Sequence, residues 1–470
     1  MSKKFFINTS IYFTSRLITL IFSFFSASLF GRYLGASNYG VYSYSISVSS
    51  ILVVFLNMGS RNYITRELIG KKNKHYFLGN FFLLRILIFI LLEIILLLYI
   101  FIVETDKLTQ FVLLIIGTTV FLNSFLTIFF SLNRSVENYY IESLNQVIVA
   151  FLTLLGYFLL LTNGYGLKSI TIFLLSLSIL QNIVIGYISL RYSHIHFSLL
   201  LKDIKLSESK RIFRELTPFL LTSIFSIIFF RIDTVMLKFY WSSKIVGFYS
   251  GAYKFFELST YIPDVLLYIL FPILVKKSLE DKKNLIAYYR KFFKYLLLIS
   301  LPASILLYSY SKDIILLIWG DKFYPSINIL KILSFAMIFV FLNYISGNII
   351  ISLKKEKILT RNTFIIAIFN IVSNIYFIPL WKAKGAAFTT LVSEALFQFL
   401  NFIVIGKFLT FKVIKIHFFS KIILLNILFF FIIKNFFIKS LFIGPVIYMS
   451  IYILLLFLFK LVDKKEFYSI

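Results

Sequence analysis

The chain has 470 residues, of which 60% are hydrophobic and only 14% are charged, and its mean hydropathy is +0.91. A soluble domain carries about a quarter charged residues, so this composition excludes a large soluble core and indicates an all-α polytopic membrane protein. The net charge of +28 would suit nucleic acid, but Lys and Arg gather between long apolar runs, where they face an anionic membrane surface, so we expect no nucleic-acid partner.

Taken in chain order, the first half is predicted to contain six membrane-spanning helices. Met1-Ser2-Lys3-Lys4 leads directly into an apolar run with no small-residue cleavage site, so we expect no removable signal peptide. A helix needs roughly 20 apolar residues to cross a bilayer. The runs that meet this length are 6–30, 41–64, 79–103, 108–130, 142–162 and 169–191.

The second half is predicted to contain six more spans, followed by two additional ones. The connection at 192–215 separates the halves, and the outside loops are short, since even the longest, at 311–326, could not form a folded domain. The chain is therefore expected to cross the membrane about 14 times. The predicted spans are 216–240, 246–273, 291–310, 327–351, 362–381 and 385–406, then 418–437 and 441–460.

The distribution of positive charge gives an orientation. If the N-terminus is cytoplasmic, most of the 48 Lys and Arg residues fall in the segments that this count of spans places inside. A missed helix would invert every later loop and spoil that alternation. We therefore predict a multi-pass protein of the bacterial inner (cytoplasmic) membrane, with both termini in the cytoplasm and membrane lipids as its surroundings.

An internal repeat relates the two halves. "YLGASNYGVYSYS" (33–45) and "YWSSKIVGFYSGA" (240–252) align at an offset of 207, which spans six helices and so preserves orientation. This predicts two parallel six-helix lobes around a central cavity that opens alternately to each side of the membrane. The predicted division is an N-terminal lobe at 1–200, a C-terminal lobe at 201–410 and two extra helices at 411–470.

Charged residues inside the spans predict where that cavity lies. A charge at the bilayer centre costs about 2.5–3.5 kcal/mol, so each one needs an explanation. Arg16 falls within the first span, and "FFRIDTVML" (229–237) places Arg231 and Asp233 in the seventh. Residues two apart on a helix point about 200° from each other, so Arg231 and Asp233 cannot simply neutralise one another. The seventh span is therefore not surrounded by lipid alone.

The eighth span adds three charges that are predicted to share one helix face, namely Lys254, Glu257 and Asp264. We predict that Arg16, Arg231 and Lys254 line the cavity and bind an anionic substrate. Asp233, Glu257 and Asp264 could balance these cations, bind a coupling ion or carry protons, and the sequence leaves these roles open.

Other charges in the spans have structural interpretations. Arg61, Arg85 and Lys331 lie near span ends and are expected to extend to the membrane interface. Glu93 and Glu394 lie in mid-span, where each could be protonated or paired between helices.

No motif points to catalysis or to a cofactor. The chain has no cysteine and no phosphate-binding G-x-x-x-x-G-K-[ST] loop. Its histidines fall in or beside cytoplasmic segments, at His75, His194, His196 and His417. We therefore expect no catalytic residue, no metal and no cofactor. Transport would draw on an ion gradient, the membrane potential or consumption of the substrate on the far side.

Two stretches carry a family resemblance. "RYLGASNYG" (32–40) and "RIDTVMLKFYWSSKIVGFYSGAYKFFEL" (231–258) resemble the openings of the two halves in polysaccharide flippases of the multidrug/oligosaccharidyl-lipid/polysaccharide exporter superfamily. The resemblance implies an O-antigen or capsule flippase that moves an undecaprenyl-diphosphate-linked repeat unit, with other polysaccharide-assembly proteins as further partners. By this resemblance Arg16, Arg231 and Lys254 would meet the polyprenyl-diphosphate-linked glycan.

Three alternatives stay open. A drug/cation antiporter of the same superfamily would favour 12 spans and an acidic cavity. An integral-membrane polysaccharide polymerase would need a substantial outside loop with acid/base residues, and no such loop is present. A structural scaffold would have little use for charges inside its spans.

Overall fold

The computed structural model describes most of the chain. The described residues are 3–70, 74–136, 138–193, 195, 204–280, 282–409, 416–436, 438, 440–441, 443–459 and 461. Within these ranges the regular structure is entirely helical, so the predicted all-α fold is confirmed. The chain divides into two compact units, at residues 1–247 and 248–470.

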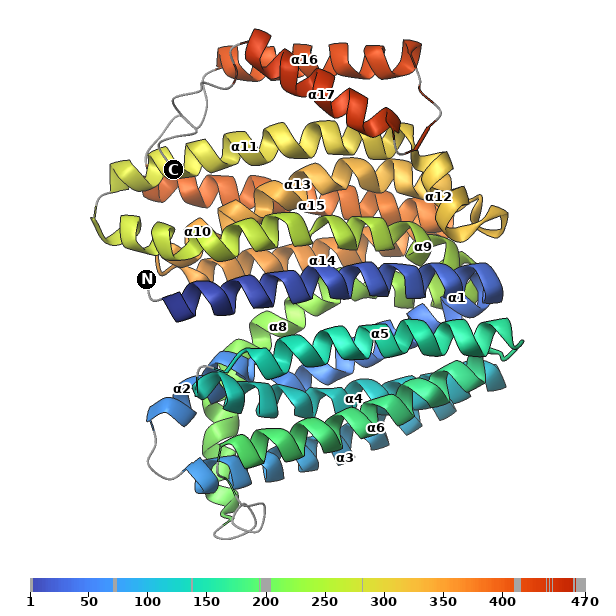
Figure 1. Cartoon of the computed structure of the whole chain (residues 1–470), viewed down its shortest axis with the longest axis vertical. Helices are drawn as coiled ribbons and strands as arrows, with labels where there is room; N and C mark the ends of the chain where they lie inside the picture. The colour runs from blue at the N-terminus through green and yellow to red at the C-terminus, as the bar shows by residue number, and fades with distance from the viewer. Residues whose placement is uncertain are drawn as a thin grey trace. The chain divides into compact units, whose positions relative to one another are not determined.

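Unit 1 contains seven long or short helices and the beginning of an eighth, which are labelled in Figure 1. Within the unit, α1 packs against α4, α5 and α8, while α4 also packs against α6. The helices are α1 (Lys3–Asn57), α2 (Ser60–Gly70), α3 (Lys74–Val103), α4 (Lys107–Ser135), α5 (Tyr140–Thr162), α6 (Leu167–Tyr192), α8 (Leu206–Tyr240) and the first residues of α9 (Ser243–Ser259).

Unit 2 is built around α13, which packs against α10, α11 and α15. α14 packs on α15, and the last two helices lie against α11 (Figure 1). The helices after α9 are α10 (Tyr261–Glu280), α11 (Lys282–Ser309), α12 (Ser311–Trp319), the 3₁₀ turn η1 (Asp321–Phe323), α13 (Ser326–Ser352), α14 (Glu356–Trp381), α15 (Ala383–Leu409), α16 (Ile416–Asn435) and α17 (Ile443–Leu458).

The predicted spans coincide with these helices. α1 consists of two helical stretches that meet at a kink at Gly35, whose φ of 76° only glycine adopts freely, and this kink separates the first two predicted spans. The second predicted span is interrupted at Met58 and Gly59, between α1 and α2. The eighth span is interrupted at Thr260, between α9 and α10. Ten helices of the described part are long and apolar enough by themselves to cross a membrane, and α17 is a shorter apolar helix. A count of about 14 spans agrees with this arrangement.

The distribution of side chains is that of a protein in lipid. On α3 the large side chains of Leu98, Phe101 and Ile102 are 55%, 87% and 76% exposed, whereas Asn80 and Arg85 on the same helix are 1% exposed. Lipid tails are as apolar as leucine, so an apolar outer surface around polar packed positions is stable only in a bilayer. The chain is therefore a multi-pass membrane protein.

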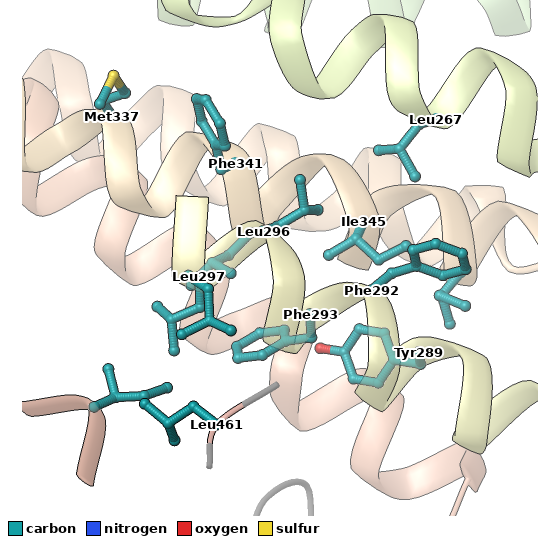
Figure 2. Close-up of a cluster of buried hydrophobic side chains, with 14 of the residues drawn as sticks. Leu267, Tyr289, Phe292, Phe293, Leu296, Leu297, Met337, Phe341, Ile345 and Leu461 are labelled. Atoms are coloured by element: carbon teal, nitrogen blue, oxygen red, sulfur yellow. The ribbon is translucent and has the colours of Figure 1, made fainter. Parts of the chain in front are cut away.

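The interior of unit 2 contains a large apolar cluster that holds α11 against α13. Figure 2 shows α11 presenting Tyr289, Phe292, Phe293, Leu296 and Leu297 along one side. Their spacing of three, four and seven residues is that of one helix face. Met337, Phe341 and Ile345 meet them from α13 with the same spacing. This packing fixes the positions of the polar side chains that α13 directs toward α15.

Within unit 1, the outer part of α1 meets the start of α9 in a very close helix crossing. A Cβ atom added to Gly40 would lie 1.7 Å from the backbone oxygen of Ser243, and one added to Gly247 would lie 1.8 Å from the backbone oxygen of Ala36. Gly40 and Gly247 differ by the repeat offset of 207, and so do Ala36 and Ser243. The contact is therefore reciprocal, as a two-fold relation between the two stretches requires.

The boundary between the compact units lies within α9 rather than near residue 200. The compact units are defined by how closely residues pack, whereas the predicted lobes follow the sequence repeat, so the boundary of the units does not test the predicted lobes. The predicted division into 1–200, 201–410 and 411–470 therefore stays a prediction.

Candidate functional site

The six residues of the predicted site belong to both units. Arg16, Arg231 and Asp233 lie in unit 1, and Lys254, Glu257 and Asp264 lie in unit 2. The three cations are all half-buried. Their joint role in one hydrated cavity stays a prediction.

Arg16 is directed toward an acidic group of the same unit. It lies on α1, which packs against α5, and its charge acts on the carboxylate of Glu142 near the start of α5. Glu142 was not predicted as a site residue, although it is at the centre of a charge network in unit 1.

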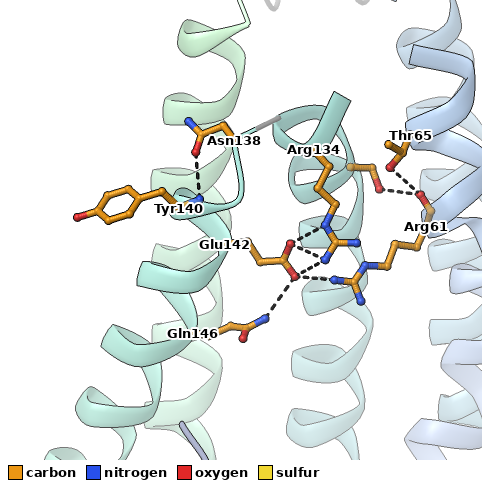
Figure 3. A network of polar contacts seen from close by, with 8 residues as sticks. Arg61, Thr65, Arg134, Asn138, Tyr140, Glu142 and Gln146 are labelled. Carbon is orange, nitrogen blue, oxygen red and sulfur yellow. Dashed lines mark hydrogen bonds and ion pairs between the residues drawn. The ribbon is translucent and has the colours of Figure 1, made fainter. Parts of the chain in front are cut away.

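Glu142 is 2% exposed and binds two further arginines, as Figure 3 shows. Arg134 of α4 donates through Nε and Nη2 at 2.8 and 2.7 Å, and Arg61 of α2 donates through Nη2 at 2.7 Å. Gln146 adds a bond of 3.3 Å from the next turn of α5. A bidentate arginine–carboxylate pair is both directional and strong. One carboxylate thus joins three helices, with excess positive charge beside it.

The expectation that Arg61 extends to the membrane interface stays a prediction. Its side chain is 40% exposed and forms an ion pair with Glu142, a partner that was not predicted. Its backbone oxygen also accepts hydrogen bonds from Thr65 and Ser131 (Figure 3). Because the Glu142 carboxylate is nearly inaccessible, we expect the Arg61 guanidinium to be more stable in this ion pair than fully solvated.

The prediction that Arg85 extends to the membrane interface was wrong, because this residue is 1% exposed inside unit 1. Its Nη2 donates to the Ser60 hydroxyl at 2.8 Å, and its Nη1 donates to the Thr127 hydroxyl at 2.9 Å and to the backbone oxygen of Ser124. The guanidinium also lies 5.2 Å from the centre of the Phe81 ring. Arg85 therefore holds α3 against α2 and α4 through neutral oxygens and an aromatic face.

On α8, Arg231 and Asp233 have different surroundings. Asp233 is 2% exposed, while Arg231 is half-buried. Both side chains interact with other protein groups. α8 packs against α1 and α3, so the expectation that this span is not surrounded by lipid alone is confirmed.

In unit 2, Lys254 and Glu257 form an ion pair on α9. The Lys254 Nζ lies 3.1 Å from Glu257 Oε2, and the two side chains are 26% and 32% exposed. The predicted common face does not continue unbroken to Asp264, because the helix is interrupted at Thr260. Asp264 is exposed in the first turn of α10, and its charge acts on the Tyr344 hydroxyl of α13.

The described ranges contain no group of three or more His, Asp or Glu side chains that could hold a metal ion. The arrangement is instead one of arginines, one lysine and single carboxylates on long helices. Such groups can bind and release an anionic headgroup.

Comparisons with solved structures identify the fold. The lipid II flippase MurJ, in an inward closed conformation, superimposes with a TM-score of 0.79 over 96% of this chain and 97% of that chain, at 20% identity. An inward-facing multidrug resistance MATE family transporter of the MOP superfamily gives 0.67 over 86% of this chain and 98% of that one, at 12% identity. The Vibrio cholerae MATE transporter VcmN gives 0.60 over 87% and 98%, at 12% identity.

Sequence comparison identifies the family. An uncharacterized membrane protein of Methanocaldococcus jannaschii, MJ1068, is 31% identical over 204 residues, a stretch that covers 42% of this chain and only 40% of that protein. Residues 5–278, more than half of the chain, match the family described as polysaccharide biosynthesis protein. The resemblance seen in the sequence is thereby confirmed, and the chain belongs to the polysaccharide biosynthesis protein family.

Proposed function

We propose that this protein is a flippase, not an enzyme, that moves a lipid-linked oligosaccharide across the membrane by alternating access. The substrate class is a polyprenyl-diphosphate-linked glycan, specifically an undecaprenyl-diphosphate-linked O-antigen or capsule repeat unit. Transport runs from the cytoplasmic to the outer face of a bacterial inner membrane, with both termini in the cytoplasm. Other polysaccharide-assembly proteins would supply and consume the substrate.

The observation that carries the proposal is the combination of family and fold. The chain belongs to a family described as polysaccharide biosynthesis protein, and 96% of it superimposes on a lipid II flippase. The MATE structures cover only 86–87% of the chain. A fold that extends over the additional C-terminal helices favours a lipid-linked substrate over a small drug.

The chemistry of the predicted site supports the same substrate. A diphosphate needs cations, the glycan needs water, and the polyprenyl tail can stay in lipid. Arg16, Arg231 and Lys254 are half-buried in helices, and arginine matches phosphate oxygens through its planar fork. We assign these three residues to the diphosphate, and Asp233, Glu257 and Asp264 to charge balance or ion coupling.

Deletion of the gene tests the class of substrate. We expect loss of surface glycan and retention of lipid-linked repeat units on the cytoplasmic face. Intact surface glycan, in a strain without a second flippase, would contradict the proposal.

Substitution of Arg231 tests the site. Loss of charge-assisted hydrogen bonds of about 1.5–3 kcal/mol should lower export by roughly tenfold or more in Arg231→Ala. Arg66→Ala is the matched control, because the Arg66 side chain is 71% exposed. Normal export by Arg231→Ala, at protein levels equal to those of the control, would remove Arg231 from the site.

A drug/cation antiporter is the second candidate, and the shared MATE fold is the observation that favours it. Overexpression would then increase resistance to cationic dyes and leave surface glycan unchanged. The polymerase alternative has no structural support among the described residues, because α12 and η1 occupy the longest outside segment without forming a domain.

A further inference from the structure

Glu142 is a buried carboxylate at the helix ends where unit 1 gathers arginines. It lies in the first turn of α5 and is 2% exposed, while Arg134 lies in the last turn of α4 and Arg61 in the first turn of α2. Under the orientation predicted from the positive loops, these helix ends face the cytoplasm. The substrate of the proposed function would arrive from that side.

The two arginines bind Glu142 in different ways. Arg134 donates through Nε and Nη2 to both carboxylate oxygens, and its side chain is 13% exposed, so it clamps the carboxylate from within the unit. Arg61 donates to it through Nη2 alone, and its side chain is 40% exposed. Figure 3 shows the two guanidinium groups reaching the carboxylate from different helices. The Nε and Nη1 donors of Arg61 are therefore not used on Glu142.

The carboxylate does not neutralise this group of arginines. In the part of the chain that the structure describes, Glu142 is the only acidic partner of Arg61 and Arg134, and a single carboxylate leaves the two with a net positive charge. The charge of Arg16, on α1, acts on the same carboxylate. Carboxylate and phosphate oxygens both accept the two parallel hydrogen bonds of an arginine fork. An incoming phosphate and Glu142 would therefore compete for the same donors.

We propose that Glu142 is an internal competitor of the substrate's diphosphate for Arg16 and Arg61. In the empty site, Glu142 neutralises part of the arginine charge. A diphosphate replaces the carboxylate at Arg61 and Arg16, while Arg134 continues to hold Glu142. This role rests on the proposed function, because it concerns the binding of the same substrate.

The competition has a use in transport. A transporter must release what it binds, so binding has to be favourable but limited. The negative charge of Glu142 remains beside the bound diphosphate and weakens its binding. Removal of the carboxylate should therefore raise the affinity for a diphosphate, although it lowers the stability of the fold. A residue that only joined helices would lower both when it is replaced.

The experiment measures diphosphate binding to the purified protein in detergent. Inorganic pyrophosphate and farnesyl diphosphate are titrated at constant ionic strength, and the rise in unfolding temperature gives the apparent dissociation constant. Glu142→Gln should bind both ligands roughly tenfold more tightly than the unaltered protein, because no charge-assisted hydrogen bond has to be replaced. Tighter binding of farnesyl diphosphate than of pyrophosphate would identify a lipid-linked ligand. Equal affinities would assign the site to a free anion and count against the proposed function.

Three further variants make the result specific. Glu142→Asp keeps the charge and should restore the affinity of the unaltered protein. Glu67→Gln is the matched control, because it removes the same charge beside Arg66, whose side chain is 71% exposed, and it should not change the affinity. Glu142→Gln combined with Arg134→Gln leaves the net charge of the protein unchanged. It removes the carboxylate together with its clamp, so it should show the same gain in affinity.

Two results would overturn the proposal. One is a Glu142→Gln protein that binds pyrophosphate no more tightly than Glu67→Gln does. The other is an equal gain in Glu142→Asp, because the negative charge would then have no effect. If Glu142→Gln does not fold, the combined variant with Arg134→Gln decides, and the absence of a gain there rejects the competition. Failure of every protein to bind either diphosphate would reject the proposed function as well.

Discussion

At the scale of single residues, acidic side chains compensate positive charges both between helices and within one helix. Glu142 forms ion pairs with Arg134 and Arg61 and interacts electrostatically with Arg16. Lys254 forms an ion pair with Glu257, one turn away on α9. Arg85 is the exception, because it is buried among hydroxyl groups, a backbone oxygen and an aromatic ring. Among these residues, Glu142 and Lys254 have partners of opposite charge, whereas Arg85 is held by neutral groups.

Glu142→Gln should destabilise the protein, because two arginines would lose their carboxylate at once. Hydrogen bonds to charged groups contribute about 1.5–3 kcal/mol each, although partial exposure of Arg61 lowers its share. We expect a clearly lower unfolding temperature in detergent. Glu67→Gln is the control, since its partner Arg66 is 71% exposed and such pairs contribute roughly 0–1 kcal/mol. Equal effects of the two substitutions would show that the network contributes no special stability.

Arg61, Arg85 and Lys254 were recognised from the sequence as charges inside the spans, whereas Glu142 was not. Hydropathy gives the depth of a residue in the membrane, so it correctly indicated that the span carrying Arg231 and Asp233 is not surrounded by lipid alone. It does not tell which helix faces which. The Ser and Thr hydroxyls and the backbone oxygen that bind Arg85 carry no charge signal, so its inward orientation was not predictable. Arg134 and Glu142, by contrast, are eight residues apart across a short turn, and that spacing could have suggested their pairing.

At the scale of helices, the crossing of α1 and α9 leaves no room for a side chain. Gly40→Ala and Gly247→Ala should each destabilise the protein by about 1–3 kcal/mol, because a Cβ would overlap a backbone oxygen. Gly406→Ala is the control: it lies in α15, has open space around its Cβ position, and should be neutral or slightly stabilising. Unfolding temperatures of the three variants provide the measurement. Similar values for all three would mean that the crossing separates at no cost.

The start of α4 offers a prediction about pH. The Thr109 hydroxyl and backbone amide donate to Asp106 at 2.6 and 3.0 Å, and these bonds hold the pKa of this carboxyl below its usual value. The stabilisation is therefore complete above a pH of about 3.9, the unfolded value, and is lost as pH falls through the lower folded value. Asp106→Ala should cost about 0.5–2 kcal/mol at neutral pH, while Asp106→Asn should retain most of the cap. A loss in Asp106→Ala that does not shrink in acid would contradict an electrostatic role.

The helices themselves were largely predictable, for a simple physical reason. Each must supply about 20 apolar residues to the bilayer, and few other segments do. The kink at Gly35 falls between the first two predicted spans. The interruptions at Met58–Gly59 and at Thr260 fall inside predicted spans, and they were less accessible because they depend on how the chain packs rather than on its hydropathy. The short helices α2 and α12 could not be predicted from a search for apolar runs of about 20 residues.

At the scale of the whole molecule, the predicted orientation can be tested directly. A reporter fused after Lys107 should be active only outside, and one fused after Lys210 only in the cytoplasm, because positive loops stay inside. Lys107 begins α4 and Lys210 lies in the first turns of α8, so each fusion point adjoins a defined helix end. Cytoplasmic activity at the first site, or external activity at the second, would require a different number of spans before it.

The reciprocal crossing at Gly40 and Gly247 has a genetic consequence. The atoms that exclude a side chain there are the carbonyl oxygens of Ser243 and Ala36, and every amino acid carries such an oxygen. Replacing the contacted residue therefore cannot relieve a clash, as it could between two side chains. Revertants of an alanine at either glycine should map to distant positions that shift a helix axis, or restore the glycine codon itself.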